Sequence, residues 1–405
     1  MGYAVSAATP FLLLAYVGPM IRERLPSGVT LADYVRIRLG RPMQVYVGII
    51  SVLYKVHLPV RRVHCDWQGD GNAIHNGAAD SDGNGGNRHR GLHLQRGTSR
   101  FPSYRSGQAW TILFLVVALL LVLFGGDIDG LIADAKAYNP EDSWSIGSMS
   151  SMDSFESGLA LIVAITAAEM FSQGNWQRAW ASESDEALTK GAWLAAGMVL
   201  PLVLVMGVLG TVVAGQGAVE DPSAAFFYLI EDAGTLFVAA FIVLAVALVC
   251  SSVDTLQNAV VASVSRDLSD GSLGLKNARY LTIGLIPIAI YLATGPTIAG
   301  FTLDALSVFK IFLFADLLAA ATVMPVLLTL WDRVSAKGAL MGAICGLLSV
   351  IAYGTITEDI GTGIGYVFSP TNEFGLANLD VFLSAVIGSA LVTVAGSYAL
   401  PDESA

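Results

Sequence analysis

Apolar residues recur in long runs along most of the chain, separated by short polar segments. The runs cover residues 3–20, 109–125, 192–213, 236–249, 280–293, 308–330, 338–353 and 381–400. Several reach the roughly 20 residues that a helix needs to cross about 30 Å of hydrocarbon. The pattern therefore predicts an all-α fold, a polytopic transmembrane helical bundle that forms one membrane domain over residues 1–405.

The composition supports this prediction. Of the 405 residues, 54% are hydrophobic and only 14% are charged, whereas soluble domains contain about 25% charged residues. This excludes a soluble enzyme and a disordered chain, and three scattered cysteines exclude a disulfide scaffold. The net charge of −11 argues against a nucleic-acid partner. Because the sequence contains no HExxH, Walker or Gly-x-Ser-x-Gly motif, we expect no enzyme and no catalytic residue.

Basic residues occupy every second loop. They lie at 22, 24, 36, 38 and 41, at 178 and 190, at 266, 276 and 279, and at 333 and 337. The intervening loops at 126–156, 215–233, 294–303 and 355–378 contain many acids and a single basic residue, Lys136. Cytoplasmic loops carry the excess of Lys and Arg. The alternation therefore predicts a multi-pass protein of the cell (plasma) membrane with an acidic extracellular loop at 126–156.

Residues 56–108 interrupt the alternation. An odd number of crossings is needed between the run that follows residue 43 and the run that begins at 109. Residues 61–108 contain seven Arg and nine Gly, and each charge at the centre of a spanning helix costs at least about 2.5–3.5 kcal/mol. We interpret 56–108 as an aberrant polar segment that replaces a transmembrane helix.

Three origins are open for this segment. It contains all five histidines, so a metal loop is one alternative, with His64, Cys65 and Asp66 adjacent and His89 and His93 four residues apart. A genuine disordered insertion is another. The third, which we favour, is translation of residues 56–105 out of frame, because codons exist whose shifted reading restores apolar strings. That reading removes about one and a half transmembrane helices, and we expect no metal site.

Three segments outside 56–105 resemble, in the same order, motifs of the sodium:solute symporter family. They are residues 30–40 (TLADYVRIRLG), 171–182 (FSQGNWQRAWAS) and 249–268 (VCSSVDTLQNAVVASVSRDL). The resemblance implies a leucine-transporter-like fold, an inverted-repeat secondary transporter with binding sites at the midplane. It also implies sodium-coupled symport of a small polar solute, with Na⁺ as the coupling ion. By this alignment the first core helix would precede Met1, so we expect the inverted repeats to be incomplete and the chain to be truncated at its N-terminus.

The resemblance places a sodium site in the run at 236–249 and the residues that follow it. It implies that the hydroxyls of Ser251 and Ser252 bind sodium together with the backbone carbonyl of Leu248. Thr255 lies one turn beyond Ser251 on the same helix face. The alternative is that these hydroxyls bond the carbonyls of their own helix or join neighbouring helices.

Polar residues at the end of the 157–174 span are candidates for contact with the solute. Gly158 and Gly174 flank this span, which suits a broken helix, and Glu169 and Gln173 lie near its end. Asp254 is a third candidate, because an acid near membrane depth should face protein or water. These residues would bind a urea-like solute, an amino acid or an organic acid within the lipid bilayer.

Two charged residues in the run at 308–330 need partners. Lys310 and Asp316 are six residues apart, so on a helix they point about 120° away from one another and cannot pair. Two other functions stay open: a channel, disfavoured because no filter motif repeats, and a non-functional or structural remnant of a transporter. The remnant is favoured by the interrupted pattern at 56–108.

Overall fold

The computed structural model describes residues 2–28, 30–56, 152–215, 234–270, 272–274, 277, 280, 283–284, 297–298, 301–302, 308–373 and 375–402. Within them, the side chains at 55–56, 154, 208–209, 211–215, 245, 248–258, 297–298, 301–302 and 308–311 are outside the description. The chain divides into two compact units. The first comprises Met1–Arg61, Glu141–Val208 and Thr255–Ala405, and the second comprises Arg62–Pro140 and Leu209–Asp254. The predicted single domain over 1–405 stays a prediction.

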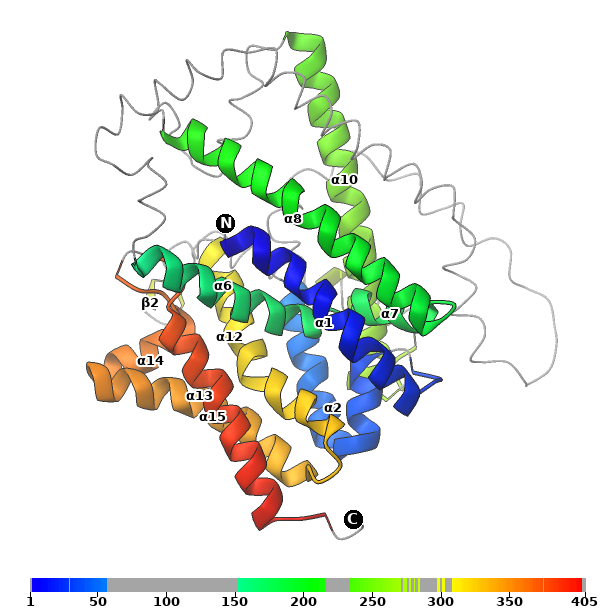
Figure 1. Ribbon diagram of the computed structural model, residues 1–405, viewed down its shortest axis with the longest axis vertical. Coiled ribbons are helices and arrows are strands. Elements are labelled where there is room, and N and C mark those ends of the chain that lie inside the picture. Colours follow the sequence, from blue (N-terminus) through cyan, green and yellow to red (C-terminus); the bar gives the residue numbers. More distant parts are fainter. Residues whose placement is uncertain are drawn as a thin grey trace, which may run out of the picture. The chain divides into compact units, whose positions relative to one another are not determined.

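The described chain is helical almost throughout, which confirms the all-α expectation (Figure 1). Its helices are α1 (Gly2–Arg24), α2 (Leu31–Val56), α6 (Met152–Met170), α7 (Gln173–Ala181), α8 (Asp185–Gly215), α10 (Thr235–Ala262), the π-helical η6 (Ser263–Leu268), α12 (Val308–Leu327), the 3₁₀ turn η7 (Leu328–Leu330), α13 (Ala336–Thr357), α14 (Ile360–Phe368) and α15 (Leu379–Ala399). Two short strands, β1 (Thr297–Ile298) and β2 (Phe301–Thr302), pair antiparallel.

Five of the described helices are long and apolar enough to cross a membrane. They lie at Gly2–Arg24, Asp185–Gly207, Phe312–Leu330, Ala336–Thr357 and Leu379–Ala399. The bent pair formed by α6 and α7 adds a sixth if it is counted as one span. These helices confirm a polytopic helical bundle. The interrupted segment at 56–108 and the acidic loop at 126–156 lie outside the described residues, apart from the end of α2 and the start of α6.

The basic segment at 22–41 differs from the loop that the sequence predicts, because α2 already begins at Leu31. The Thr30 hydroxyl accepts from the Asp33 backbone N–H at 2.9 Å, and the Asp33 carboxylate accepts from the Thr30 N–H at 3.3 Å. This reciprocal capping starts the helix. A kink at Gly40 (φ 78°, ψ −177°) then separates the basic half from the apolar half, a conformation open almost exclusively to glycine.

Small residues bring α13 and α15 together. Three glycines of α13 are spaced four apart, and three hydroxyl residues of α15 have the same spacing: Gly338, Gly342 and Gly346, and Ser389, Thr393 and Ser397. A methyl group added at Gly342 would overlap Thr393 Oγ1. The two backbones therefore approach closely, as small residues at fourfold spacing allow in membrane helices, and the helices lie side by side (Figure 1).

Alanines line the centre of the first unit. Three alanines of α6 and three of α12 are fully buried: Ala160, Ala164, Ala168 and Ala319–Ala321. These small side chains let α6 pack between α1 and α12. The end of α6 and the middle of α12 are thereby held next to each other inside the unit.

Candidate functional site

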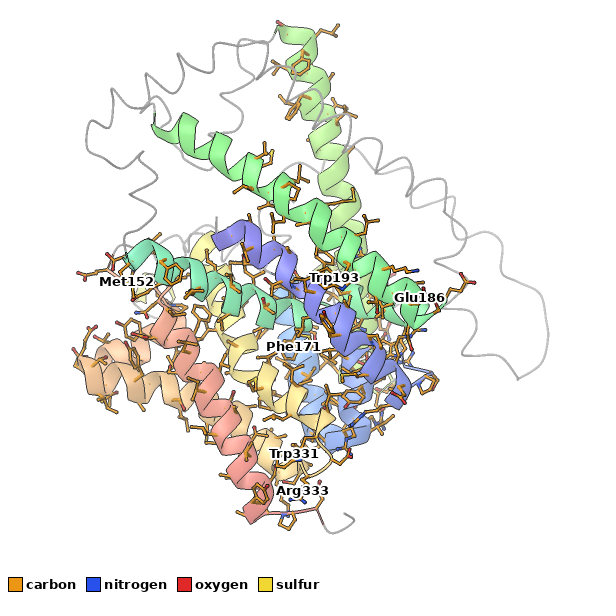
Figure 2. The ribbon with its side chains drawn as sticks, viewed as in Figure 1. Met152, Phe171, Glu186, Trp193, Trp331 and Arg333 are labelled. Carbon is orange, nitrogen blue, oxygen red and sulfur yellow. The ribbon has the colours of Figure 1, made fainter. Side chains whose placement is uncertain are left out.

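The helix predicted to be broken is broken. α6 and α7 meet at a bend of 59° across Phe171 and Ser172. The Trp176 indole Nε1–H donates to the Met170 carbonyl at 2.5 Å, and both Trp176 and Phe171 are buried. Phe171, which lies at the bend, is labelled in Figure 2. The indole thus binds one of the last carbonyls of α6, which is the kind of group that a helix end leaves for a side chain to satisfy, and this contact helps to hold the bend in place.

Glu169 lies at this break with both carboxylate oxygens engaged. The Tyr54 hydroxyl of α2 donates to Oε1 at 2.6 Å, and Asn175 Nδ2 of α7 donates to Oε2 at 2.8 Å. Hydrogen bonds to an ionised carboxylate are shorter and roughly twice as strong as neutral ones. Three helices therefore fix the orientation of one acidic group at the point where the span is interrupted.

A second acid lies nearby on α12. Asp316 is 0% exposed, and neither of its carboxylate oxygens has a hydrogen-bond partner among the described residues. It interacts electrostatically with Glu169, and Tyr3 and Tyr54 interact with both acids. We call Tyr3, Tyr54, Glu169 and Asp316 the carboxylate cluster. Tyr3 is 55% exposed, so the cluster extends from the edge of the first unit to its interior.

The other predicted site residues fall in two places. Gln173 is the first residue of α7 and is 2% exposed, so it lies within the same broken helix as Glu169. Leu248, Ser251, Ser252, Asp254 and Thr255 all lie in the continuous helix α10. Their side chains are outside the described part of the chain, and so is the side chain of Lys310. The sodium site therefore stays a prediction.

The structure adds to the site three residues that sequence reasoning did not place there. Asn175 follows the apolar run directly, and an amide beside a helix-ending glycine was a signal for a contact with the freed groups. Asp316 is visible in the sequence as an acid inside an apolar run, although its neighbours are not. Tyr54 carries no such signal, because tyrosine is common in apolar helices.

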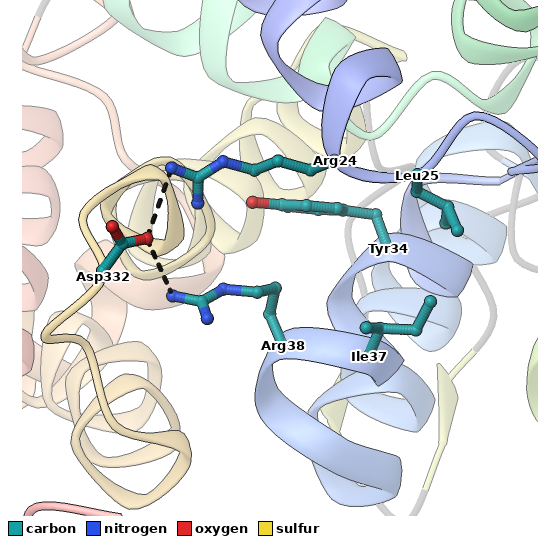
Figure 3. Close-up of a pocket in the computed structure, with 6 residues that line it drawn as sticks. All are labelled: Arg24, Leu25, Tyr34, Ile37, Arg38 and Asp332. Atoms are coloured by element: carbon teal, nitrogen blue, oxygen red, sulfur yellow. Dashed lines mark ion pairs between the residues drawn. The ribbon is translucent and has the colours of Figure 1, made fainter. Parts of the chain in front are cut away.

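A second polar region lies where the basic loops meet. Arg24 donates to the carbonyls of Thr329 (2.9 Å) and Leu330 (2.7 Å), and it pairs with Asp332 at 3.4 Å. Arg38 lies 3.9 Å from the same carboxylate and also reaches the Thr329 carbonyl. Figure 3 shows both arginines converging on Asp332. They line a cavity of about 340 Å³ together with Leu25, Tyr34 and Ile37. Its charge suits an anion and not an amine.

Further ion pairs join the remaining basic loops. Arg22 pairs with Asp185 at 3.0 Å, Arg266 pairs with Asp33 at 3.1 Å, and Arg36 pairs with Asp270. Every loop segment in these pairs is one that the charge alternation predicts to be cytoplasmic. The ion pairs bring these basic segments together, as the charge alternation leads one to expect, while the side of the membrane on which they lie stays a prediction.

The metal-loop alternative concerns residues outside the description, since His64, Cys65, Asp66, His89 and His93 all lie between 57 and 151. Among the described residues, no group of three or more His, Cys, Asp or Glu side chains is arranged to hold a metal ion. The frameshift interpretation of 56–105 falls on the same undescribed stretch and stays a prediction.

Comparison with known proteins points to transport. No family model matches the chain. The chain is 25% identical over 420 residues to the spermidine transporter DUR31 of Candida albicans, in an alignment that covers 98% of this chain and 75% of that protein. This similarity, over nearly the whole length, supports a membrane transport function and, with the apolar helices, a multi-pass membrane protein.

Proposed function

We propose that this chain is a secondary transporter that imports a small organic amine by sodium-coupled symport across the plasma membrane. The observation that carries the proposal is the Glu169 carboxylate, held at the break between α6 and α7 by Tyr54 and Asn175. An acid within a membrane segment is costly unless a cation or donors face it. A protonated amine supplies both a positive charge and up to three N–H donors.

The amine is the solute class that best fits this carboxylate. An organic acid would be repelled by Glu169, and an uncharged urea-like solute would leave the carboxylate without a counter-ion. An amino acid matches only through its amino group. The similar protein of Candida albicans is named a spermidine transporter, and spermidine is an aliphatic polyamine that is cationic at neutral pH. Gln173 offers a buried amide donor and acceptor in the same broken helix.

We assign the proposed sodium site to α10. The hydroxyls of Ser251 and Ser252 and the carbonyl of Leu248 would bind the ion, with Thr255 one turn away and Asp254 adjusting the local charge. The support is the resemblance of residues 249–268 to the symporter motif and the helical backbone that carries them. Coupling requires that sodium and solute stabilise the same conformation, so that each raises the affinity for the other by the same factor.

The test measures binding of radiolabelled spermidine to the full chain in lipid nanodiscs, in NaCl and in KCl. We expect tighter binding in sodium, loss of that preference when Ser251 and Ser252 are both changed to alanine, and weak binding in either salt for Glu169→Gln. Ser384→Ala is the matched control, since that hydroxyl bonds the Val381 carbonyl within α15. Equal binding in both salts overturns sodium coupling. Stronger competition by an organic acid than by an amine overturns the solute class.

A transporter remnant is the second candidate, favoured by the charged segment at 61–108 in the sequence. Uptake into proteoliposomes under an inward sodium gradient separates the two. Accumulation of spermidine inside the vesicles supports the transporter. Binding in nanodiscs without any uptake identifies the remnant, and restoring an apolar reading of 56–105 should then recover uptake.

A further inference from the structure

The carboxylate cluster contains two acidic groups, whereas one ammonium group carries a single positive charge. Glu169 and Asp316 interact electrostatically, and no Arg, Lys or His among the described residues forms an ion pair with either of them. At the cytoplasmic end, by contrast, each aspartate of an ion pair faces an arginine. Two like charges in a medium of low dielectric constant repel each other strongly, and a cation relieves that repulsion.

The two acids are unequally supplied with donors. Glu169 accepts from Tyr54 and Asn175, whereas both oxygens of the fully buried Asp316 accept from none of the described groups. A buried carboxylate without donors is expensive. Within a membrane segment, such an acid is by default a candidate for contact with a transported species.

We infer that Asp316 is a second cation-binding carboxylate of the solute site, so that the site selects solutes with two ammonium groups over solutes with one. This inference rests on the proposed function. Glu169 on α6 would receive one ammonium group and Asp316 on α12 the other. Because the two acids belong to different helices, a diammonium solute would also bridge α6 and α12.

Tyrosines complete the fit for an alkyl diamine. Tyr54 and Tyr3 lie within electrostatic reach of both acids, and their rings offer apolar faces that attract ammonium groups and methylene chains. Tyr54 is 2% exposed and Tyr3 is 55% exposed. The site thus combines two negative ends with an aromatic lining, whereas an inorganic cation needs several oxygen ligands.

The experiment compares 1,4-diaminobutane with 1-aminobutane, which differ by one charge over the same carbon chain. Binding of each to the full chain in nanodiscs is measured by competition with radiolabelled spermidine. We expect the wild type to prefer the diamine and Asp316→Asn to lose about tenfold or more in diamine affinity, as loss of a charge-assisted contact predicts. Affinity for 1-aminobutane should change by less than about twofold. Asp316→Glu retains the charge and should restore most of the preference for the diamine.

Each other outcome has a separate meaning. If the wild type binds neither amine, the proposed function fails and this inference fails with it. If the wild type binds both amines equally, or Asp316→Asn retains the diamine preference, the inference alone is overturned. If Asp316→Asn weakens the binding of both amines by the same factor, Asp316 serves in proton binding or in packing, and the inference is again overturned. Thermal unfolding of each variant shows that the protein is folded under the conditions of the assay.

Discussion

The buried aspartate of η6 should make the stability of the protein depend on pH. Asp267 lies in η6, outside the candidate membrane spans of the described helices. It is 0% exposed. The Thr30 hydroxyl donates to Oδ1 at 2.9 Å, and Oδ2 has no partner among the described residues. Burial, reinforced by the nearby Asp33, raises the pKa of Asp267 to about 7, although Thr30, Ser263 and Arg266 act in the opposite direction.

The sign of the effect follows from the two pKa values. The ordinary pKa is 3.8 and the folded value is about 7, so between these pH values the folded protein holds a proton that the unfolded chain has released. The contribution of Asp267 to stability is therefore most favourable below pH 3.8 and becomes less favourable by about 1.4 kcal/mol per pH unit as the pH rises towards 7. Above pH 7 the full penalty, about 4 kcal/mol, is present.

Asp267→Asn removes this titration and retains an oxygen that accepts from Thr30. We expect the free energy of unfolding of the variant to exceed that of the wild type by about 4 kcal/mol at pH 8.5. At pH 5.5 this difference should be smaller by about 2 kcal/mol. The assay is equilibrium unfolding in mixed micelles, followed by tryptophan fluorescence from pH 5 to 8.5. Asp332→Asn is the control. Because the Asp332 side chain is 86% exposed, this substitution should leave the dependence of the unfolding free energy on pH unchanged. Parallel pH curves for wild type and Asp267→Asn would refute the reasoning.

Three further substitutions test the helix packing, the kink in α2 and the contacts of Arg24 by the same unfolding assay. Arg24→Gln, which loses two hydrogen bonds to main-chain carbonyls, should cost about 2 kcal/mol or more, while Asp332→Asn should cost less than about 1 kcal/mol; equal losses would contradict this ranking. Gly342→Ala introduces a methyl group onto Thr393 and should cost about 1–3 kcal/mol, whereas Gly197→Ala on α8 meets open space and should be neutral or stabilising. Gly40→Ala, at φ 78°, should cost about 1–3 kcal/mol, and an unchanged midpoint would show that the kink is not needed.

Much of the architecture follows from sequence patterns that act locally. Apolar runs of spanning length give the helices. The alternation of basic and acidic loops predicts that the basic segments lie together, and the ion pairs of Arg22, Arg36 and Arg266 join several of them. The broken helix was expected from the glycines that flank the span, but the break itself falls at Phe171 and Ser172, and Gly158 and Gly174 are both helical. The helical start of α2 was missed because a short basic segment with Gly40 inside it resembles a loop, and α14 was missed for a similar reason within 355–378.

The site is less predictable because its contacts are non-local. Glu169 stands out as an acid at the end of an apolar run, and the structure gives it two donors. The same sequence logic notices Asp316 but cannot name its neighbours, since these depend on how α12 packs against α6 and α2. Tyr54 lies 115 residues before Glu169, and no spacing rule connects them. Ser251 and Ser252 rest on family resemblance, and binding assays will decide their role.

The wide separation of these residues along the chain also governs how the protein is made. The ribosome releases Tyr54 and Glu169 long before Asp316, which follows Glu169 by 147 positions. Glu169 and Tyr54 can therefore meet before α12 is synthesised, whereas Asp316 reaches the bilayer later with α12. We therefore expect the carboxylate cluster to be completed only when α12 joins the helices that were made before it.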